Sequence, residues 1–286
     1  MSFISLNFVV LFACTFILYH TLPSRFRKAT LLTASCLFIG FYHLAFLITA
    51  LILTLTTFYL GKWIGQAKRE SGMKGIYFSG VCFLVVSWLA FRYADRLTNC
   101  HILFPLGISF YTFQAISYLT EIYWQEEEPE KSLPDFMIYM LFFMKFLSGP
   151  IERASDMLPQ LKSCKATDYT SMVYGMRLIV VGLIKKLILA DSIAPYIDGV
   201  FGSVYTASGV QLLMACLLYP IELYADFSGY TDIALGGARM LGFKLSPNFN
   251  RPFIAQTTAD FWRRWHMSLA ARINDQQEVA EQMNDL

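Results

Sequence analysis

The sequence predicts an all-α, polytopic transmembrane helix bundle that includes re-entrant or short membrane segments. Of its 286 residues, 56% are hydrophobic and only 15% are charged, whereas a soluble domain has roughly 45–50% apolar and about 25% charged residues. Several uncharged runs also approach the roughly 20 residues that a helix needs to cross about 30 Å of hydrocarbon. These observations exclude a soluble enzyme.

The uncharged runs define the expected membrane segments in chain order. Residues 2–20 form the first, and residues 29–61, about 50 Å long as a helix, are expected to form a helical hairpin that turns near residues 40–43. The next two runs are residues 75–91 and 97–120, and a short loop with Arg92 separates them. The last expected crossing is residues 199–221.

Other stretches are too short or too charged for a simple crossing. Residues 136–151 are interrupted by Lys145 and by Gly149-Pro150, which predicts a re-entrant or buried segment shielded by protein. Residues 169–190 are apolar but carry Arg177, Lys185 and Lys186, and these charges must snorkel or face a polar interior because each is costly at mid-membrane. The acidic stretch 121–135 is expected to be a solvated turn rather than a metal site.

The basic residues predict the orientation of the chain. They cluster before and after the 29–61 hairpin, so both flanking loops should be cytoplasmic and the N-terminus outside. The first segment has no basic start and no small-residue cleavage site, which indicates a retained span rather than a signal peptide. The residues behind this orientation are Arg25, Arg27, Lys28, Lys62, Lys68, Arg69 and Lys74.

Composition excludes or disfavours several other functions. The net charge is only +2 and the basic residues are scattered, so no nucleic-acid partner is expected. The four histidines occur singly and the six cysteines contain no C-x-x-C pair, so no metal site is predicted. No internal repeat is evident, which weakens the interpretation as an inverted-repeat transporter.

Polar residues inside apolar runs are functional candidates because a membrane penalises them unless a partner receives them. The first group lies in residues 104–117, where Gln114 and Ser117 can hydrogen-bond between helices. Helix packing is the favoured interpretation, and contact with a substrate is the alternative.

The second group consists of three carboxylates that directly follow the uncharged run 199–221. Glu222 and Asp226 share a helix face at i, i+4 spacing, and Gly229 is expected to bend the chain before Asp232. Two interpretations stay balanced: an ion-paired structural network that uses Arg239, or the polar lining of a tunnel or proton relay.

The third group occupies residues 248–252 and 260–266. Its tryptophans and arginines are typical of membrane-interface anchors. His266 differs, because imidazole titrates near neutrality and suits general-base chemistry on a hydroxyl. A single histidine is nevertheless more often structural than catalytic.

Together with residues 147–153, these stretches closely resemble the membrane-bound O-acyltransferase (MBOAT) family, nearest to its bacterial alginate O-acetylase branch. The resemblance covers residues 1–269 as the N-terminal part of an MBOAT-like transmembrane domain, and residues 270–286 form a divergent polar tail. It implies a catalytic histidine at His266. By the same resemblance and by position in the apolar runs, the candidate substrate-binding residues are Asp226, Ser228, Asp232, Asn250, Arg251 and Gln114.

The resemblance also implies the chemistry and its setting. An acetyl group would pass from a thioester donor, acetyl-CoA or another, to an exported polysaccharide such as alginate, with no tightly bound cofactor. Membrane lipid and periplasmic polysaccharide-acetylation proteins would be the partners, at the bacterial inner membrane. Members of this branch continue into a segment with a second histidine, usually taken as the principal catalytic one, and His266 is the last histidine here. We therefore expect an incomplete bundle of doubtful activity, with a non-catalytic docking scaffold or a small-solute transporter as alternatives.

Overall fold

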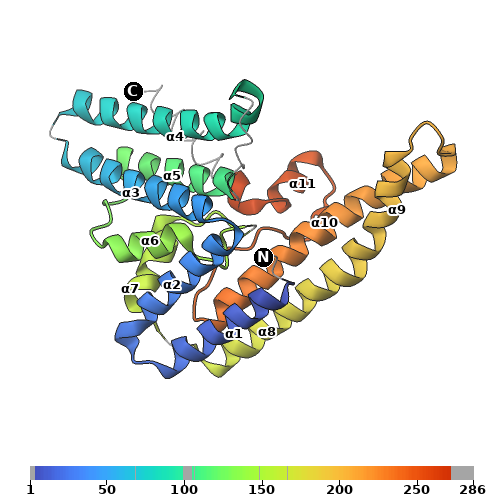
Figure 1. Ribbon diagram of the computed structural model, residues 1–286, viewed down its shortest axis with the longest axis horizontal. Coiled ribbons are helices and arrows are strands. Elements are labelled where there is room, and N and C mark those ends of the chain that lie inside the picture. Colours follow the sequence, from blue (N-terminus) through green and yellow to red (C-terminus); the bar gives the residue numbers. More distant parts are fainter. Residues whose placement is uncertain are drawn as a thin grey trace. The chain divides into compact units, whose positions relative to one another are not determined.

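The computed structural model describes residues 4–67, 69–98, 105, 107–147, 149–165 and 167–271, and these form helices joined by loops without any strand (Figure 1). They belong to two compact units. The first unit comprises the described residues up to 147, residues 151–165 and residue 271, and the second comprises residues 149–150 and 167–270. The expected all-α fold is confirmed. The part of the expected tail from residue 272 onward lies outside the described residues.

Three helices are long and apolar enough to cross a membrane among the residues that the structure describes. A shorter apolar helix, α1, covers Leu6–Thr21. The expectation of several membrane helices is therefore confirmed. The three candidate spans are Leu44–Gln66, Glu70–Tyr93 and Gly209–Met240.

The predicted hairpin in residues 29–61 is present as α2 (Ser24–Tyr42) and α3 (Leu44–Gln66). His43 separates the two helices with an extended backbone, and its Nδ1 atom accepts the N–H of Ala45 at 3.2 Å. This side chain satisfies one of the amide groups that the start of a helix leaves free. The turn thus lies where the sequence predicted it.

Helix α4 (Glu70–Thr98) contains the predicted segment 75–91 but is longer than expected. It continues through Arg92, so the expected loop at that position is wrong; a charged residue near a helix end can reach water without ending the helix. Of the expected segment 97–120, residues 99–104 and 106 lie outside the described residues, and the remainder belongs to α5 (Ile108–Tyr123).

The short apolar stretch after α5 is buried, as the sequence predicts. Helix α6 (Leu133–Leu141) has only nine residues, and the chain then leaves helical geometry before α7 (Ala154–Ser163). Phe142 and Phe143 in the irregular part are fully buried. The backbone of this part is therefore shielded by protein.

The second unit is built on two antiparallel helical runs that lie side by side (Figure 1). One run consists of α8 (Tyr169–Leu183), the π-helical segment η1 (Ile184–Ala190) and α9 (Asp191–Gly202). The other is the 32-residue helix α10 (Gly209–Met240). The short elements η2 (Pro252–Ile254) and α11 (Thr258–Arg264) follow.

The expected crossing at residues 199–221 has the wrong bounds, because α9 ends at Gly202 and the candidate span α10 begins only at Gly209 and continues to Met240. Hydroxyl groups explain the turn between them. Ser203 Oγ donates to the carbonyl of Gly199 at 2.7 Å, and Ser208 with Gln211 forms a reciprocal capping box at the start of α10. An uncharged stretch can therefore turn where side chains replace the helical backbone hydrogen bonds.

Glycines allow the two helical runs of the second unit to touch through their backbones. A Cβ atom at Gly175 would lie 2.6 Å from the carbonyl oxygen of Gly236, and one at Gly182 would lie 2.6 Å from that of Gly229. The expected bend at Gly229 is wrong, since α10 passes through it as a continuous helix. Its missing side chain permits close packing instead.

Candidate functional site

His266 lies in a turn that two backbone hydrogen bonds hold against an extended segment. The amide of Asn250 donates to the carbonyl of Arg264 at 3.0 Å, and the amide of Met267 donates to the carbonyl of Asn248 at 2.8 Å. His266 itself has a φ of 46°, in the left-handed region that most side chains avoid. Such a backbone persists only when its surroundings fix it, and it is frequent at functional sites.

The side chain of Asn248 adds a third hydrogen bond to this turn. Asn248 is completely buried, and its Oδ1 atom accepts the hydroxyl of Ser268 at 2.5 Å. Ser268 follows His266 by two residues, so the bond fixes the chain immediately after the histidine. Asn248 thus holds both the backbone and a side chain of the His266 turn.

Aromatic rings from α10 and α11 support the same turn. The imidazole of His266 meets the ring of Phe227 edge-on, with 5.1 Å between ring centroids. Trp265 stacks on Phe261 at 5.5 Å and meets Phe249 edge-on at 5.1 Å. Burial among such groups lowers the pKa of His266 below its usual value. The imidazole is therefore neutral near pH 7 and able to accept a proton.

The carboxylates of α10 form ion pairs with the π-helical segment. Lys185 Nζ lies 2.6 Å from an oxygen of Asp232. Lys186 pairs with Asp226 and also with Asp191, the latter at 2.8 Å. The structure thus supplies an ion-paired network, as one of the two interpretations expects, but its cations are lysines rather than Arg239.

The remaining candidates of the second unit differ in exposure. Ser228 is 1% exposed, and its hydroxyl makes no hydrogen bond to any described residue. Asn250 and Arg251 are exposed and directly precede η2. Asn250 itself pairs with the His266 turn through its backbone amide. The second unit therefore contains every sequence-predicted site residue except Gln114.

Gln114 belongs to the first unit and is fully engaged there. Its amide nitrogen donates to the carbonyl of Tyr139 at 2.9 Å, and its oxygen accepts the ammonium of Lys145 at 2.6 Å. Lys145 is only 4% exposed and lies over the ring of Tyr139. These contacts favour the packing interpretation of Gln114.

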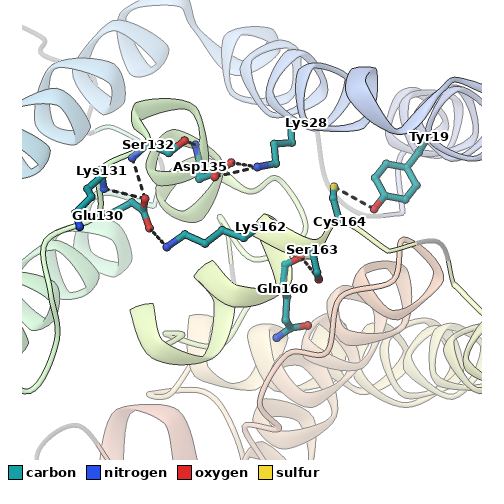
Figure 2. Close-up of polar contacts among 10 residues, drawn as sticks. All are labelled: Tyr19, Lys28, Glu130, Lys131, Ser132, Asp135, Gln160, Lys162, Ser163 and Cys164. Atoms are coloured by element: carbon teal, nitrogen blue, oxygen red, sulfur yellow. Dashed lines mark hydrogen bonds and ion pairs between the residues drawn. The ribbon is translucent and has the colours of Figure 1, made fainter.

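The acidic stretch 121–135 is only partly the solvated turn that was expected. Glu126 and Glu128 are exposed, but Glu130 is 4% exposed. Figure 2 shows one Glu130 oxygen accepting the amides of Lys131 and Ser132, each at 2.8 Å, and the other oxygen facing Lys162 at 2.8 Å.

Burial would raise the pKa of Glu130, but these donors outweigh it and lower the pKa below its usual value. Lys28 similarly lies 2.7 Å from the buried carboxylate of Asp135 (Figure 2). The loop is thus anchored by buried, paired carboxylates. Among the described residues no group of three or more potential metal ligands occurs.

Sequence reasoning missed three features of the site. The charges of Lys185 and Lys186 were expected to be unfavourable inside a membrane, but the sequence did not show that the aspartates of α10 pair with them. Asn248 was grouped with its neighbours but not seen as the residue that holds the turn. The close helix contact was visible in the sequence as two glycine pairs of equal seven-residue spacing, which place glycines on one face two turns apart. These are Gly175 with Gly182 and Gly229 with Gly236.

The chain is similar to known proteins over the region that contains this site. Residues 130–271 match the membrane-bound O-acyltransferase family, MBOAT. A probable alginate O-acetylase AlgI of Azotobacter vinelandii is 34% identical over 96% of this chain and 58% of its own length. A peptidoglycan O-acetyltransferase of Helicobacter pylori is 30% identical over 86% of this chain and 54% of its own.

A teichoic acid D-alanyltransferase of Bacillus subtilis is 31% identical over 59% of this chain and 44% of its own length. The chain thus spans a little over half the length of its alginate and peptidoglycan relatives. It is a membrane protein, and it belongs to the membrane-bound O-acyltransferase family.

Proposed function

We propose that this chain takes part in moving an acetyl group from a thioester donor to a hydroxyl of an exported polysaccharide, with alginate as the first candidate. The family and the names of its alginate and peptidoglycan relatives support acetyl transfer. We place the chain in the bacterial inner membrane with its N-terminus outside, where periplasmic acetylation proteins would receive the product. The donor is acetyl-CoA or another thioester.

The observation that carries this proposal is the fixed, neutral imidazole of His266. Its turn is held by Asn248 and by the backbone of Asn250, and burial lowers its pKa. A neutral imidazole can take the proton of an acceptor hydroxyl while the hydroxyl oxygen attacks the thioester carbonyl carbon. The carbon–sulfur bond then breaks, and the sulfur leaves with the proton that the imidazolium returns.

The other candidates have distinct roles in this proposal. Asn250 and Arg251 are exposed beside the His266 turn and are available to contact substrate. Ser228 offers a buried hydroxyl without a described partner. Asp226 and Asp232 would keep the interior polar through their lysine partners, which argues against a transporter that needs a freely titrating aspartate.

Acetyl transfer by the chain and by its His266→Ala variant tests the proposal. Membranes containing either form are incubated with radiolabelled acetyl-CoA and alginate oligosaccharides, and label in the polysaccharide is counted. Loss of a general base costs about 10²–10⁴-fold in rate, so we expect the variant to retain about 1% of transfer or less. His20→Ala, a histidine replaced in the first unit, is the matched control.

Equal transfer by the wild type and the His266→Ala variant would contradict the proposed role of His266. If the wild-type chain transfers nothing yet co-purifies with acetylation proteins, the alternative of a non-catalytic docking scaffold is favoured instead.

A further inference from the structure

Lys185 makes a second contact besides its ion pair with Asp232. Its ammonium lies 2.6 Å from an Asp232 oxygen and 5.6 Å from the centre of the Tyr224 ring. Tyr224 and Asp232 lie about two turns apart on one side of α10. Lys185 therefore reaches across from the other helical run of the second unit and connects these two points.

Tyr224 packs against the segment that forms the His266 turn. Its ring meets Phe249 edge-on at 5.6 Å and Phe253 edge-on at 5.3 Å. It also lies 6.2 Å from the ring of Trp265, which directly precedes His266. Both neighbours of Phe249 pair with the turn through their backbones. One ring of α10 thus contacts both segments that meet at the turn.

The π-helical geometry of η1 allows two adjacent lysines to face α10. A π-helix has hydrogen bonds from i to i+5 and more residues per turn than an α-helix, so neighbouring side chains diverge less. Lys185 accordingly reaches Asp232, and Lys186 reaches Asp226. Single π-helical turns are frequent at functional sites, and this one places a cation beside the Tyr224 ring.

The surroundings of Lys185 strengthen its contact with the ring. The side chains of Lys185 and Asp232 are only 25% and 17% exposed. A cation that has lost part of its hydration is attracted more strongly to the face of an aromatic ring. The carboxylate also limits the positions that the ammonium can take. Lys185 is therefore held where it restrains Tyr224.

We propose that Lys185 and Tyr224 are positioning residues for the His266 turn. Asp232 fixes the ammonium of Lys185, the ammonium holds the Tyr224 ring, and the ring supports the aromatic side chains on both segments of the turn. This support depends on the contacts described above. Its effect on acetyl transfer rests on the proposed function, because His266 acts there as the base.

Fluorine NMR on the full chain labelled with 5-fluorotryptophan and purified in non-ionic detergent tests the support directly. The chain has five tryptophans, and Trp265→Phe assigns the resonance of the turn. We expect Lys185→Met to shift or broaden the Trp265 resonance. Trp88, which donates to the hydroxyl of Ser109 in the first unit, should keep its resonance and report folding.

Matched variants separate the cation–π contact from a general loss of charge. Lys185→Arg keeps a cation that can lie over the ring and should retain the Trp265 resonance of wild type. Arg177→Met removes a positive charge from an exposed position of α8 and should also retain it. If Lys185→Met alone does not fold, Lys185→Met combined with Asp232→Leu removes the cation without leaving an unpaired carboxylate.

Acetyl transfer supplies the second measurement, with kcat expressed per folded molecule from the Trp88 resonance. Small displacements of a catalytic group are costly in rate, so we expect Lys185→Met and Tyr224→Leu to lower kcat about tenfold or more. The KM for acetyl-CoA should stay within about twofold, and Lys185→Arg should restore most of kcat. A residue that only stabilises the fold would change the amount of folded protein and leave kcat per folded molecule unchanged.

An unchanged Trp265 resonance in both the single and the double Lys185 variants would overturn the proposal, whatever the activity. The same is true if Arg177→Met changes that resonance as much as Lys185→Met does. A changed resonance in a chain whose wild type transfers no acetyl group would support the positioning contact and count against the proposed function. The two failures are therefore distinguishable.

Discussion

The backbone contact between α8 and α10 makes Gly236→Ala a sharp test of how the second unit is held together. A Cβ atom at Gly236 would lie 2.5 Å from the carbonyl oxygen of Gly175 and 2.8 Å from Cγ1 of Ile179. Ordinary contacts between carbon and a carbonyl oxygen begin at about 3.3–3.6 Å. The two helices must therefore separate by roughly 1 Å to admit the methyl group.

The magnitude follows from two opposing effects. Overpacking a tight contact costs about 1–3 kcal/mol, and the upper value applies because the opposing oxygen belongs to a rigid helix backbone. Alanine is more favourable than glycine inside a helix by about 1 kcal/mol. We therefore expect Gly236→Ala to lower the free energy of unfolding by about 2 kcal/mol, which reduces the ratio of folded to unfolded protein up to about 30-fold.

Unfolding in increasing mole fractions of SDS, followed by circular dichroism, measures this change. Gly199→Ala is the matched control, because Gly199 lies inside α9 and a Cβ atom there meets nothing within 4 Å. The control should be stabilised by about 0.5–1 kcal/mol through helix propensity alone. Gly236→Ala at least as stable as Gly199→Ala would refute the close contact.

Three further predictions concern polar contacts. Asp232→Asn leaves Lys185 without its carboxylate, so the free energy of unfolding should fall by about 2 kcal/mol in the same SDS assay. The double variant Asp232→Leu with Lys185→Met removes both charges and should lose less stability than Asp232→Asn, and an equal loss in both would contradict the pairing. Because the pKa of Glu130 is lowered in the folded protein, its stabilisation is present above the pKa of an unfolded glutamate and is lost as the pH falls through the folded value. The melting temperature of Glu130→Gln should accordingly depend less on pH below about 5 than that of wild type, and parallel profiles would exclude this role. Asn248→Ala should reduce His266-dependent acetyl transfer at least about tenfold by loosening the turn, with Ser268→Ala reproducing part of the loss; unchanged kcat in both would separate the turn from the chemistry.

Hydropathy and length predicted the helical class and the hairpin that breaks at His43, because the membrane imposes a minimum length on apolar helices. The same criterion failed at residues 203–208. There the chain turns without any charged residue, since the hydroxyls of Ser203 and Ser208 replace the helical backbone partners. Absence of charge identifies residues that a membrane tolerates, but it does not identify where a helix ends.

The site shows a similar division between local and long-range information. The titration range of imidazole made His266 a candidate, but the resemblance to the family's motif was needed to prefer it over the other three histidines. The carboxylate of Asp226 could not be assigned a partner, because Lys186 lies 40 residues earlier and reaches it through a π-helical segment that local propensity does not reveal. The buried amide of Asn248 was equally invisible, since its role depends on a contact with Ser268 across a turn.

The lysine–aspartate pairs have a consequence for how the protein is made. Lys185 and Lys186 leave the ribosome 40 or more residues before Asp232 and Asp226, and each unpaired charge costs roughly 2.5–3.5 kcal/mol at the centre of a bilayer. The η1 segment is thus a poor membrane helix until α10 has been synthesised. We therefore expect the lysines of η1 to be paired only once α10 has emerged, so the timing of translation becomes part of the folding of the second unit.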